Sequence, residues 1–411
     1  MSTKKILNFF EDFLEKETLF KDKKTLQSAY TPEEIPHREE QLNEIANILA
    51  PALKKEKPSN LFLYGKTGTG KTLSVTYVTN QMQILAEEKK IPLKIIYINC
   101  KLKKVVDTEY RLIAEISKKF GKLIPPTGLP TDEVYNIFFE ALDSEEQNIL
   151  LILDEIDQLV KKSGDEIIYN LTRINSDLKN AQLSIIGISN NLGFSNNLDP
   201  RVKSSLSEEE LVFPPYNALQ LKDILKKRAN DAFKKDVLSS GLTEKCAAFA
   251  ARDHGDARRA LELLRVAGEL AERKNAKKIT IKHLDEAEEK LERDKVIDIV
   301  ETQPKQFQLV LYSIMLLNEL NTNINTGKVY SNYRILCEKI ELRPITQRRV
   351  SDIISEFDML GILTVDVVSK GRYGRTRNIE LAINPDLLDK IKNLLETSIG
   401  VSRNYDKTKN N

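Results

Sequence analysis

The stretch NLFLYGKTGTGKTLSV, residues 60–75, decides the fold. The apolar residues Leu61–Tyr64 predict a strand that runs into a glycine-rich loop, and a helical pattern follows Lys71 and Thr72. This order of strand, loop and helix is the setting that a phosphate-binding loop requires. Glycines let backbone N–H groups close around phosphate oxygens, and the helix start adds positive potential. The stretch therefore predicts a nucleotide-binding α/β fold.

Within this loop, residues have separate expected tasks. Lys71 should reach the β and γ phosphates of ATP or ADP, and Thr72 should hold Mg²⁺. A glycine-rich turn without a ligand is the alternative interpretation. The residues expected to contact the nucleotide are Gly65, Lys66, Thr67, Gly68, Thr69, Gly70, Lys71, Thr72 and Leu73.

A second pattern, NILLILDEIDQL at residues 148–159, places acids directly after an apolar run. Ile149–Leu153 predict a buried parallel strand, and ligands bind at the carboxyl ends of strands in open α/β sheets. We expect Asp154 to hold Mg²⁺ and Glu155 to polarise the attacking water. Asp157 is a third acid or a helix cap, and we favour the cap.

A third predicted strand, LSIIGISNN at residues 183–191, carries Asn190 near its end. A polar side chain there can orient the lytic water or touch the γ phosphate, although asparagine at a strand end is also a common turn former. The alternation of strands and helices through residues 60–215 predicts a parallel sheet covered by helices.

In their order along the chain, these motifs resemble those of the AAA+ ATPases. They are more closely similar to the archaeal replication initiators related to the eukaryotic origin recognition complex. The resemblance rests on the phosphate loop, Asp154-Glu155, Asn190 and HGDARRALELLRVAGELA at residues 254–271, and it covers about residues 26–395. It implies an AAA+ α/β domain at 1–214, a helical lid at 215–300, a winged-helix domain at 301–400 and a disordered tail at 401–411.

The resemblance also assigns residues around the nucleotide. Ile35, His37 and Arg38 of YTPEEIPHREEQL (residues 30–42) are expected near the adenine, and Tyr216 is expected to contact the nucleotide from FPPYNALQLKDILKKRA (residues 213–229).

Three arginines have expected roles that follow from the resemblance or from position. Gly255 and Asp256 predict a helix start, and a cation in the first turn does not complement the helix dipole, so a phosphate partner for Arg258 is reasonable. The resemblance makes Arg258 the sensor-2 arginine, with Arg259 a solvated neighbour. Arg201 is either an arginine finger for a neighbouring subunit or part of a local salt bridge.

The segment NCKLKKVVDTEYRLIAEISKKFG, residues 99–121, follows another predicted strand. In the initiators it resembles, a helical insertion at this place contacts DNA, which makes Lys101, Lys103 and Lys104 candidates. A solvated lysine face is the alternative.

The C-terminal part predicts three helices, within residues 305–320, 331–341 and 345–363, and then two strands, at 363–368 and 378–383. Val350, Ile353, Ile354 and Phe357 form a core-facing stripe on the third helix. Three helices followed by a β-hairpin are typical of a winged helix, which binds DNA or another protein. If it binds DNA, the candidate contacts at the start of the third helix are Thr346, Gln347, Arg348 and Arg349.

The hairpin tip SKGRYGRTRN, residues 369–378, is basic and glycine-containing. Its expected DNA contacts are Lys370, Gly371, Arg372, Tyr373, Gly374, Arg375 and Arg377. The alternatives are a solvated turn at the tip, and pairing of Arg348 or Arg349 with Asp352.

The composition of the chain limits which partners and which cellular compartment we expect. The 411 residues contain 63 basic and 61 acidic residues, so net charge does not identify a partner. The three distant cysteines form no metal or disulfide pattern, and no apolar run is long enough for a membrane span, so we expect a cytoplasmic protein without a membrane partner. The resemblance to the initiators implies that it is nucleoid-associated. Residues 1–17 predict an amphipathic helix.

The resemblance implies a weak ATPase that binds double-stranded origin DNA, with other initiator subunits and the replicative helicase as possible partners. ATP would act as a conformational switch for replication licensing. A nucleotide-binding transcriptional regulator and a clamp or helicase loader are the alternatives.

Overall fold

The computed structural model describes residues 17–27, 30–101, 108–125, 127–195, 198–206, 208–320, 324–369, 375–383 and 385–400. The predicted N-terminal helix (except Glu17) and the predicted disordered tail lie outside these residues. The chain divides into two compact units, residues 1–285 and 286–411.

Unit 1 contains a five-stranded parallel sheet with strand order β2-β3-β4-β1-β5. Its strands are β1 (Asn60–Tyr64), β2 (Leu93–Asn99), β3 (Gln147–Asp154), β4 (Ala181–Ser189) and β5 (Glu208–Val212). β3 is buried from Asn148 to its end because both faces of the sheet are covered, as its continuous apolar run predicted. Tyr64 pairs with Ser189, and Asn99 pairs with Asp154, so the ends that carry the polar motifs lie at one edge.

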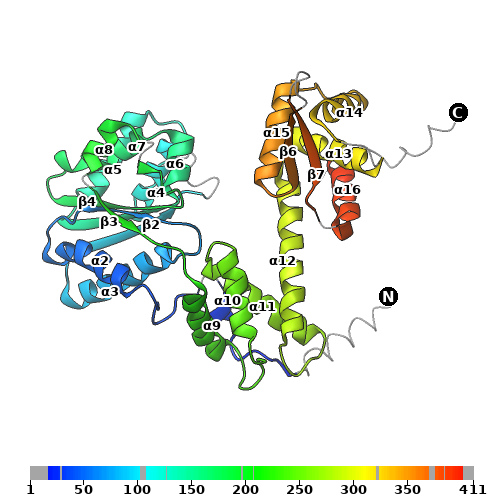
Figure 1. The fold of residues 1–411 in the computed structure, drawn as a ribbon. Coiled ribbons are helices and arrows are strands. Elements are labelled where there is room, and N and C mark those ends of the chain that lie inside the picture. Colours follow the sequence, from blue (N-terminus) through cyan, green and yellow to red (C-terminus); the bar gives the residue numbers. More distant parts are fainter. Residues whose placement is uncertain are drawn as a thin grey trace, which may run out of the picture. The chain divides into compact units, whose positions relative to one another are not determined.

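Helices cover both faces of this sheet (Figure 1). One face packs on α2 (Glu39–Leu49), η2 (Ala50–Lys54) and α3 (Lys71–Lys89). The other packs on α4 (Glu109–Lys119), α5 (Thr131–Leu142), α6 (Ile156–Ser163), α7 (Glu166–Arg173), η3 (Ile174–Ser176) and α8 (Pro200–Leu206). This arrangement confirms the predicted α/β class.

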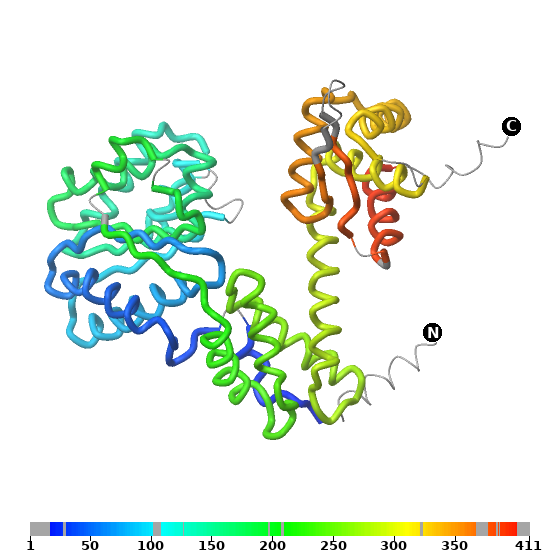
Figure 2. The backbone as a smooth tube through the Cα atoms, in the orientation of Figure 1, coloured from blue at the N-terminus to red at the C-terminus, as the bar shows by residue number. Residues whose placement is uncertain are grey.

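The lid of unit 1 is helical and includes the beginning of the described chain. Its helices are α9 (Ala218–Ala232), α10 (Leu242–Arg252) and α11 (Ala257–Arg273). The segment 17–27, with η1 (Lys23–Leu26), packs on α9 and α11, although the sequence assigned it to the α/β domain (Figure 2). Phe20 stacks on Phe233 with ring centroids 4.7 Å apart. A Cβ atom on Gly268 would lie 2.6 Å from Cζ of Phe20, so glycine permits this contact.

Unit 2 is a winged helix. Its elements are α13 (Lys305–Glu319), α14 (Thr326–Lys339), α15 (Gln347–Met359), β6 (Leu363–Ser369), β7 (Arg375–Leu381) and α16 (Pro385–Ile399), and α12 (Ile281–Thr302) leads into it across the boundary between the units. The predicted stripe on α15 is confirmed, because Val350, Ile353, Ile354 and Phe357 are fully buried.

Helix α16 was not predicted. Its signals are Pro385 at the first helical position and buried Leu387, Ile391 and Leu395 at helical spacing. Across both units, no helix that the structure describes has the apolar length that a bilayer span requires.

Candidate functional site

The phosphate loop joins β1 to α3 at the polar edge of the sheet. Gly68 and Gly70 have φ angles of 71° and 94°, in the left-handed region that favours glycine. A Cβ atom on Gly68 would lie 1.8 Å from Oδ1 of Asp256, so a larger residue there would displace the lid. Gly70 occupies the N-cap position of α3. The free N–H groups of that first turn therefore suit a bound phosphate group.

Lys71 is buried beneath this loop. Its Nζ donates to the backbone oxygens of Gly65 and Lys66, at 2.7 and 2.8 Å, and to Oδ1 of Asn190 at 2.9 Å. Burial lowers the pKa of Lys71 to about 8, and the nearby charge of Asp154 opposes that shift. The structure thus brings together Lys71 and Asn190, the two side chains that the sequence assigned to the γ phosphate.

Asp154 ends β3 with an almost buried carboxylate. Its Oδ2 accepts hydrogen bonds from Thr72 Oγ1 at 3.1 Å and from Tyr97 Oη at 2.7 Å, and its Oδ1 accepts one from the Glu155 N–H at 2.9 Å. Tyr97 was not predicted as a site residue. Its only signal in the sequence is a hydroxyl-bearing ring close to the end of β2.

Thr72 and Asp154 fit a magnesium site. Mg²⁺ binds hydroxyl and carboxylate oxygens, and in proteins it usually keeps several ligands from water and substrate phosphates. In the part of the chain that the structure describes, no group of three or more His, Cys, Asp or Glu residues is placed to hold a metal ion. Nucleotide phosphates and water would therefore have to complete the coordination.

The acids after Asp154 have different surroundings. Glu155 has a φ of 54° at the N-cap position of α6, and its carboxylate lies 3.6 Å from Nζ of Lys101. Our preference for Asp157 as the helix cap was wrong, because Glu155 holds that position. Asp157 lies in the first turn of α6, where its Oδ1 accepts a hydrogen bond from Ser189 Oγ at 3.0 Å. Lys103 and Lys104 lie outside the described residues.

The lid helix α11 begins against the phosphate loop. Its predicted start is confirmed, since Oδ1 of Asp256 accepts hydrogen bonds from the N–H groups of Arg258 and Arg259, at 2.8 and 3.2 Å. The Ala257 N–H donates to the carbonyl oxygen of Gly68 at 3.2 Å. Arg258 is exposed and faces the same cavity as Gly68. Direct contact between lid and loop places Arg258 beside the expected phosphate position.

Two other arginines pair within the chain. Arg259 is not the solvated neighbour that we expected, because its Nε lies 2.6 Å from Oδ2 of Asp253 and its side chain is only 21% exposed. Arg201 lies on α8, where its Nε is 3.1 Å from Oδ1 of Asp199. The local salt bridge considered for Arg201 is therefore present, and this residue does not line the nucleotide cavity.

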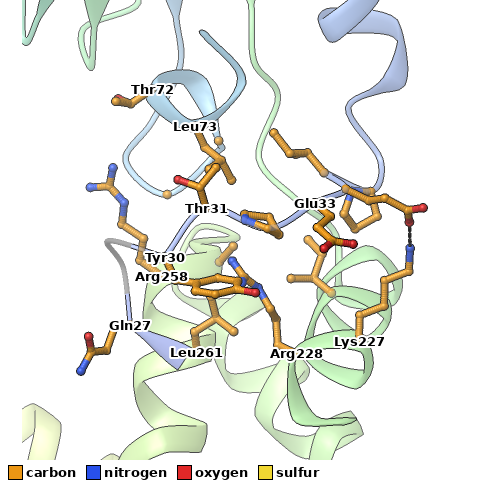
Figure 3. A pocket seen from close by; sticks show the side chains of 18 of the residues that line it. Gln27, Tyr30, Thr31, Glu33, Thr72, Leu73, Lys227, Arg228, Arg258 and Leu261 are labelled. Atoms are coloured by element: carbon orange, nitrogen blue, oxygen red, sulfur yellow. Dashed lines mark hydrogen bonds and ion pairs between the residues drawn. The ribbon is translucent and has the colours of Figure 1, made fainter. Parts of the chain in front are cut away.

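The sheet edge and the lid enclose a cavity of about 780 Å³, a size typical of ligand pockets (Figure 3). Its walls come from residues 30–36, the phosphate loop, β2, α9 and α11. Ile35 and Tyr216 line it, as does Leu73. The contribution of α9, which includes Lys227 and Arg228, was not predicted, because an amphipathic pattern does not show what its helix faces.

His37 and Arg38 are not among the residues that line the cavity, and their expected position near the adenine stays a prediction. His37 is turned toward the lid, with its Nε2 3.3 Å from Oδ2 of Asp223. Arg38 is buried, donates from Nε to the carbonyl oxygen of Thr69 at 2.9 Å, and lies over the Tyr216 ring at 3.9 Å. Arg38 therefore supports the phosphate loop from outside the cavity.

In unit 2, the start of α15 presents polar side chains. Thr346 is the N-cap residue. Gln347 and Arg348 are exposed, and the Arg348 side chain makes no hydrogen bond or ion pair within the described residues. Arg349 is paired, but its Nη1 lies 3.2 Å from Glu356 instead of binding the Asp352 that we considered. Gln347 and Arg348 are therefore the freest of the four candidates.

The hairpin that follows is described only in part. Residues 370–374 lie outside the described residues, while Arg375 begins β7. Arg377 was predicted to contact DNA, and this stays a prediction. Its Nη1 donates to the carbonyl oxygen of Ser351 at 3.2 Å and to the hydroxyls of Ser351 and Ser355 at 3.0 and 2.9 Å. Arg377 thus ties the hairpin to α15.

Comparison with protein families gives three matches in chain order. Residues 54–192 match an AAA domain, residues 222–289 match the Cdc6 AAA+ ATPase-type lid domain, and residues 298–391 match the CDC6 C terminal winged helix domain. These ranges agree with the sheet, the lid and the winged helix described above.

Comparison with whole proteins extends over almost the entire chain. An ORC1-type DNA replication protein of Pyrococcus abyssi is 54% identical over 382 residues, which cover 92% of this chain and 90% of that protein. An ORC1-type DNA replication protein 1 of Methanosarcina mazei is 52% identical over 377 residues, which cover 91% and 90%. The structure of the Aeropyrum pernix ORC1 protein in complex with DNA has a TM-score of 0.82 at 45% identity, covering 93% of this chain and 98% of that one.

Proposed function

Since the chain belongs to the ORC1-type DNA replication proteins, a family of AAA+ initiators, we propose that it binds origin DNA under the control of a bound adenine nucleotide. The Aeropyrum pernix relative is an ORC1 protein in complex with DNA, which supports DNA as the partner. Gln347 and Arg348 would read base edges, and the basic residues 370–375 would contact phosphates. Lys101 and the neighbouring lysines would add contacts from the ATPase domain. The site of action would be the nucleoid.

One observation supports the proposed control by the nucleotide. The lid helix α11 forms a hydrogen bond with the phosphate loop, and its Arg258 lines the same cavity as that loop. ADP lacks the γ phosphate, so a lid residue that contacts this group distinguishes the two nucleotides. A ligand shifts a conformational equilibrium only by its differential affinity for the two states. ATP would therefore favour a closed lid, and hydrolysis would release it.

Hydrolysis would use the side chains at the ends of β3 and β4. Glu155 would polarise the attacking water, and Asn190 and Lys71 would hold the γ phosphate. Mg²⁺ held by Thr72 and Asp154 would supply charge neutralisation at the phosphates. We propose a slow reaction, because Arg201 does not line the cavity of its own chain and an isolated chain would lack a second subunit's arginine. Other initiator subunits and the replicative helicase would be the further partners.

A genome-wide footprint of the protein with ATP and with ADP tests this proposal. We expect enrichment at one or a few origins with ATP and weaker enrichment with ADP. A footprint at many promoters that persists with ADP would support a transcriptional regulator instead. Rapid DNA-stimulated ATP turnover by a closed ring would support a loader.

A further inference from the structure

Arg228 is a buried charge without a hydrogen-bond partner in the part of the chain that the structure describes. It lies on α9 with only 7% of its surface exposed. Its Nη1 has no hydrogen-bond partner, and its side chain forms no ion pair within the described residues. Buried guanidinium groups normally bond to acceptors, because an unmet charged donor in a low-dielectric site is unfavourable. The unpartnered Nη1 therefore points to an acceptor that the described residues do not provide.

The surroundings of Arg228 favour a ligand as the source of that acceptor. Arg228 lines the 780 Å³ cavity, and its guanidinium lies 4.6 Å from the centroid of the Tyr30 ring, which lines the same cavity. Burial lowers the pKa of Arg228, and the neighbouring groups that oppose this shift are Tyr30 and Asp231. Asp231 is exposed and forms no ion pair with Arg228. The stack on Tyr30 holds the guanidinium plane, and the buried Nη1 has no hydrogen-bond partner among the described residues.

The position of Arg228 separates it from the phosphate contacts. Figure 3 shows the Arg258 side chain extending from α11 toward the level of Thr72, whereas Arg228 rises from α9 and ends beside the Tyr30 ring. The phosphate loop would hold the phosphates at the Thr72 side of the cavity. The wall made by residues 30–36 and α9 is then left for the base and the ribose.

We propose that Arg228 binds the nucleoside part of the adenine nucleotide, donating from its guanidinium group to a ring nitrogen or a ribose oxygen while stacked on Tyr30. Arg228 is then a binding residue that recognises ATP and ADP alike, in contrast to Arg258. This inference rests on the proposed nucleotide-dependent function, because it names a further contact within the same site.

The test compares the full-length wild type with Arg228→Met, which keeps an unbranched side chain against Tyr30 but removes the charge. Titration calorimetry measures the affinities for ADP and for a non-hydrolysable ATP analogue, and calorimetric scanning measures the thermal transition without nucleotide. We expect both affinities to fall by about 10- to 100-fold, the loss of a hydrogen bond to a charged group. The thermal transition should stay unchanged or rise, because the removal of a buried charge without a hydrogen-bond partner among the described residues offsets the lost cation–π contact with Tyr30.

Lys226→Met is the matched control. Lys226 lies on the same helix as Arg228 but does not line the cavity, its Nζ lies 3.6 Å from Oε1 of Glu244, and its side chain is 51% exposed. We expect Lys226→Met to change either affinity by less than about twofold, in line with a weak exposed ion pair. Equal losses in both variants would overturn the assignment to Arg228.

Three further results would overturn the inference. Unchanged affinities in Arg228→Met would show that the residue does not touch the nucleotide. A loss confined to the ATP analogue would place Arg228 at the γ phosphate. A thermal transition lowered together with both affinities would make Arg228 a structural residue. Failure of the wild type to bind any adenine nucleotide would instead refute the proposed function, so the two failures are distinguishable.

Discussion

Replacing Arg258 with alanine should weaken ATP binding and leave ADP binding nearly unchanged. The side chain is exposed in the nucleotide cavity and makes no hydrogen bond or ion pair within the described residues. Its removal therefore breaks no side-chain contact of the nucleotide-free protein, and the backbone cap bond to Asp256 remains. Any loss of affinity would come from the nucleotide complex itself.

The size of the effect follows from the type of contact. A hydrogen bond to a charged group contributes about 1.5–3 kcal/mol, and solvent screening of an exposed arginine reduces this to about 1–1.5 kcal/mol. Such a loss corresponds to roughly 5- to 13-fold weaker binding of ATP. The affinity for ADP should change by less than about twofold, because the γ phosphate is absent.

Titration calorimetry with Mg²⁺, ADP and a non-hydrolysable ATP analogue measures both affinities. Arg259→Ala is the control, since Arg259 occupies the same helical turn but pairs with Asp253. The control should lower the thermal transition and keep the ratio of the two affinities. An Arg258→Ala protein whose affinities for ATP and ADP fall equally would refute the sensor role, as would an altered ratio in the control.

The remaining predictions concern the acids, the tyrosine and the winged helix. Glu155→Gln should keep the affinity for ATP and slow phosphate release at least ~100-fold. Normal ATP turnover in this variant would show that another group polarises the attacking water. Tyr97→Phe removes the hydrogen bond to Asp154. It should raise the Mg²⁺ concentration needed for half-maximal ATP binding about fivefold and leave the thermal transition unchanged. An unchanged Mg²⁺ requirement would contradict this prediction. Arg348→Ala should cost about 1–3 kcal/mol of origin affinity and relax specificity in an anisotropy assay at fixed salt. Arg349→Ala should cause a smaller loss of origin affinity than Arg348→Ala, because Arg349 already pairs with Glu356. A larger loss in Arg349→Ala would make Arg349 the main DNA contact of the two.

The fold was predictable because each motif is local and has a fixed relation to a strand end. The loop glycines, Asp154 and Asn190 all follow apolar strands, and parallel strands bring their carboxyl ends to one edge. The contact of Lys71 with Asn190 is a consequence of that geometry. Helix α15 was predictable for a similar reason, since periodic apolar residues identify its buried face.

The cavity wall made by residues 30–36 and α9 was not predictable, because it depends on packing between distant segments. Arg228 and Tyr30 lie in different parts of the chain, and no spacing rule relates them. The partners of Asp157 and Arg377 were not predictable for the same reason. Each looked available in the sequence, but Asp157 bonds to Ser189 on β4 and Arg377 bonds back to α15. Sequence patterns identify candidate charges but do not show which are already paired.

The packing of residues 17–27 on the lid has a consequence for how the chain is assembled. Thr18 bonds to Glu272 across 254 positions, and Phe20 and Leu26 are buried in the lid. Synthesis starts at the N-terminus, so these apolar residues leave the ribosome long before their partners exist. The lid core is completed only after the whole sheet has been made. A fragment that begins at residue 215 would therefore lack part of its own core, and the ATPase unit should be produced as one piece.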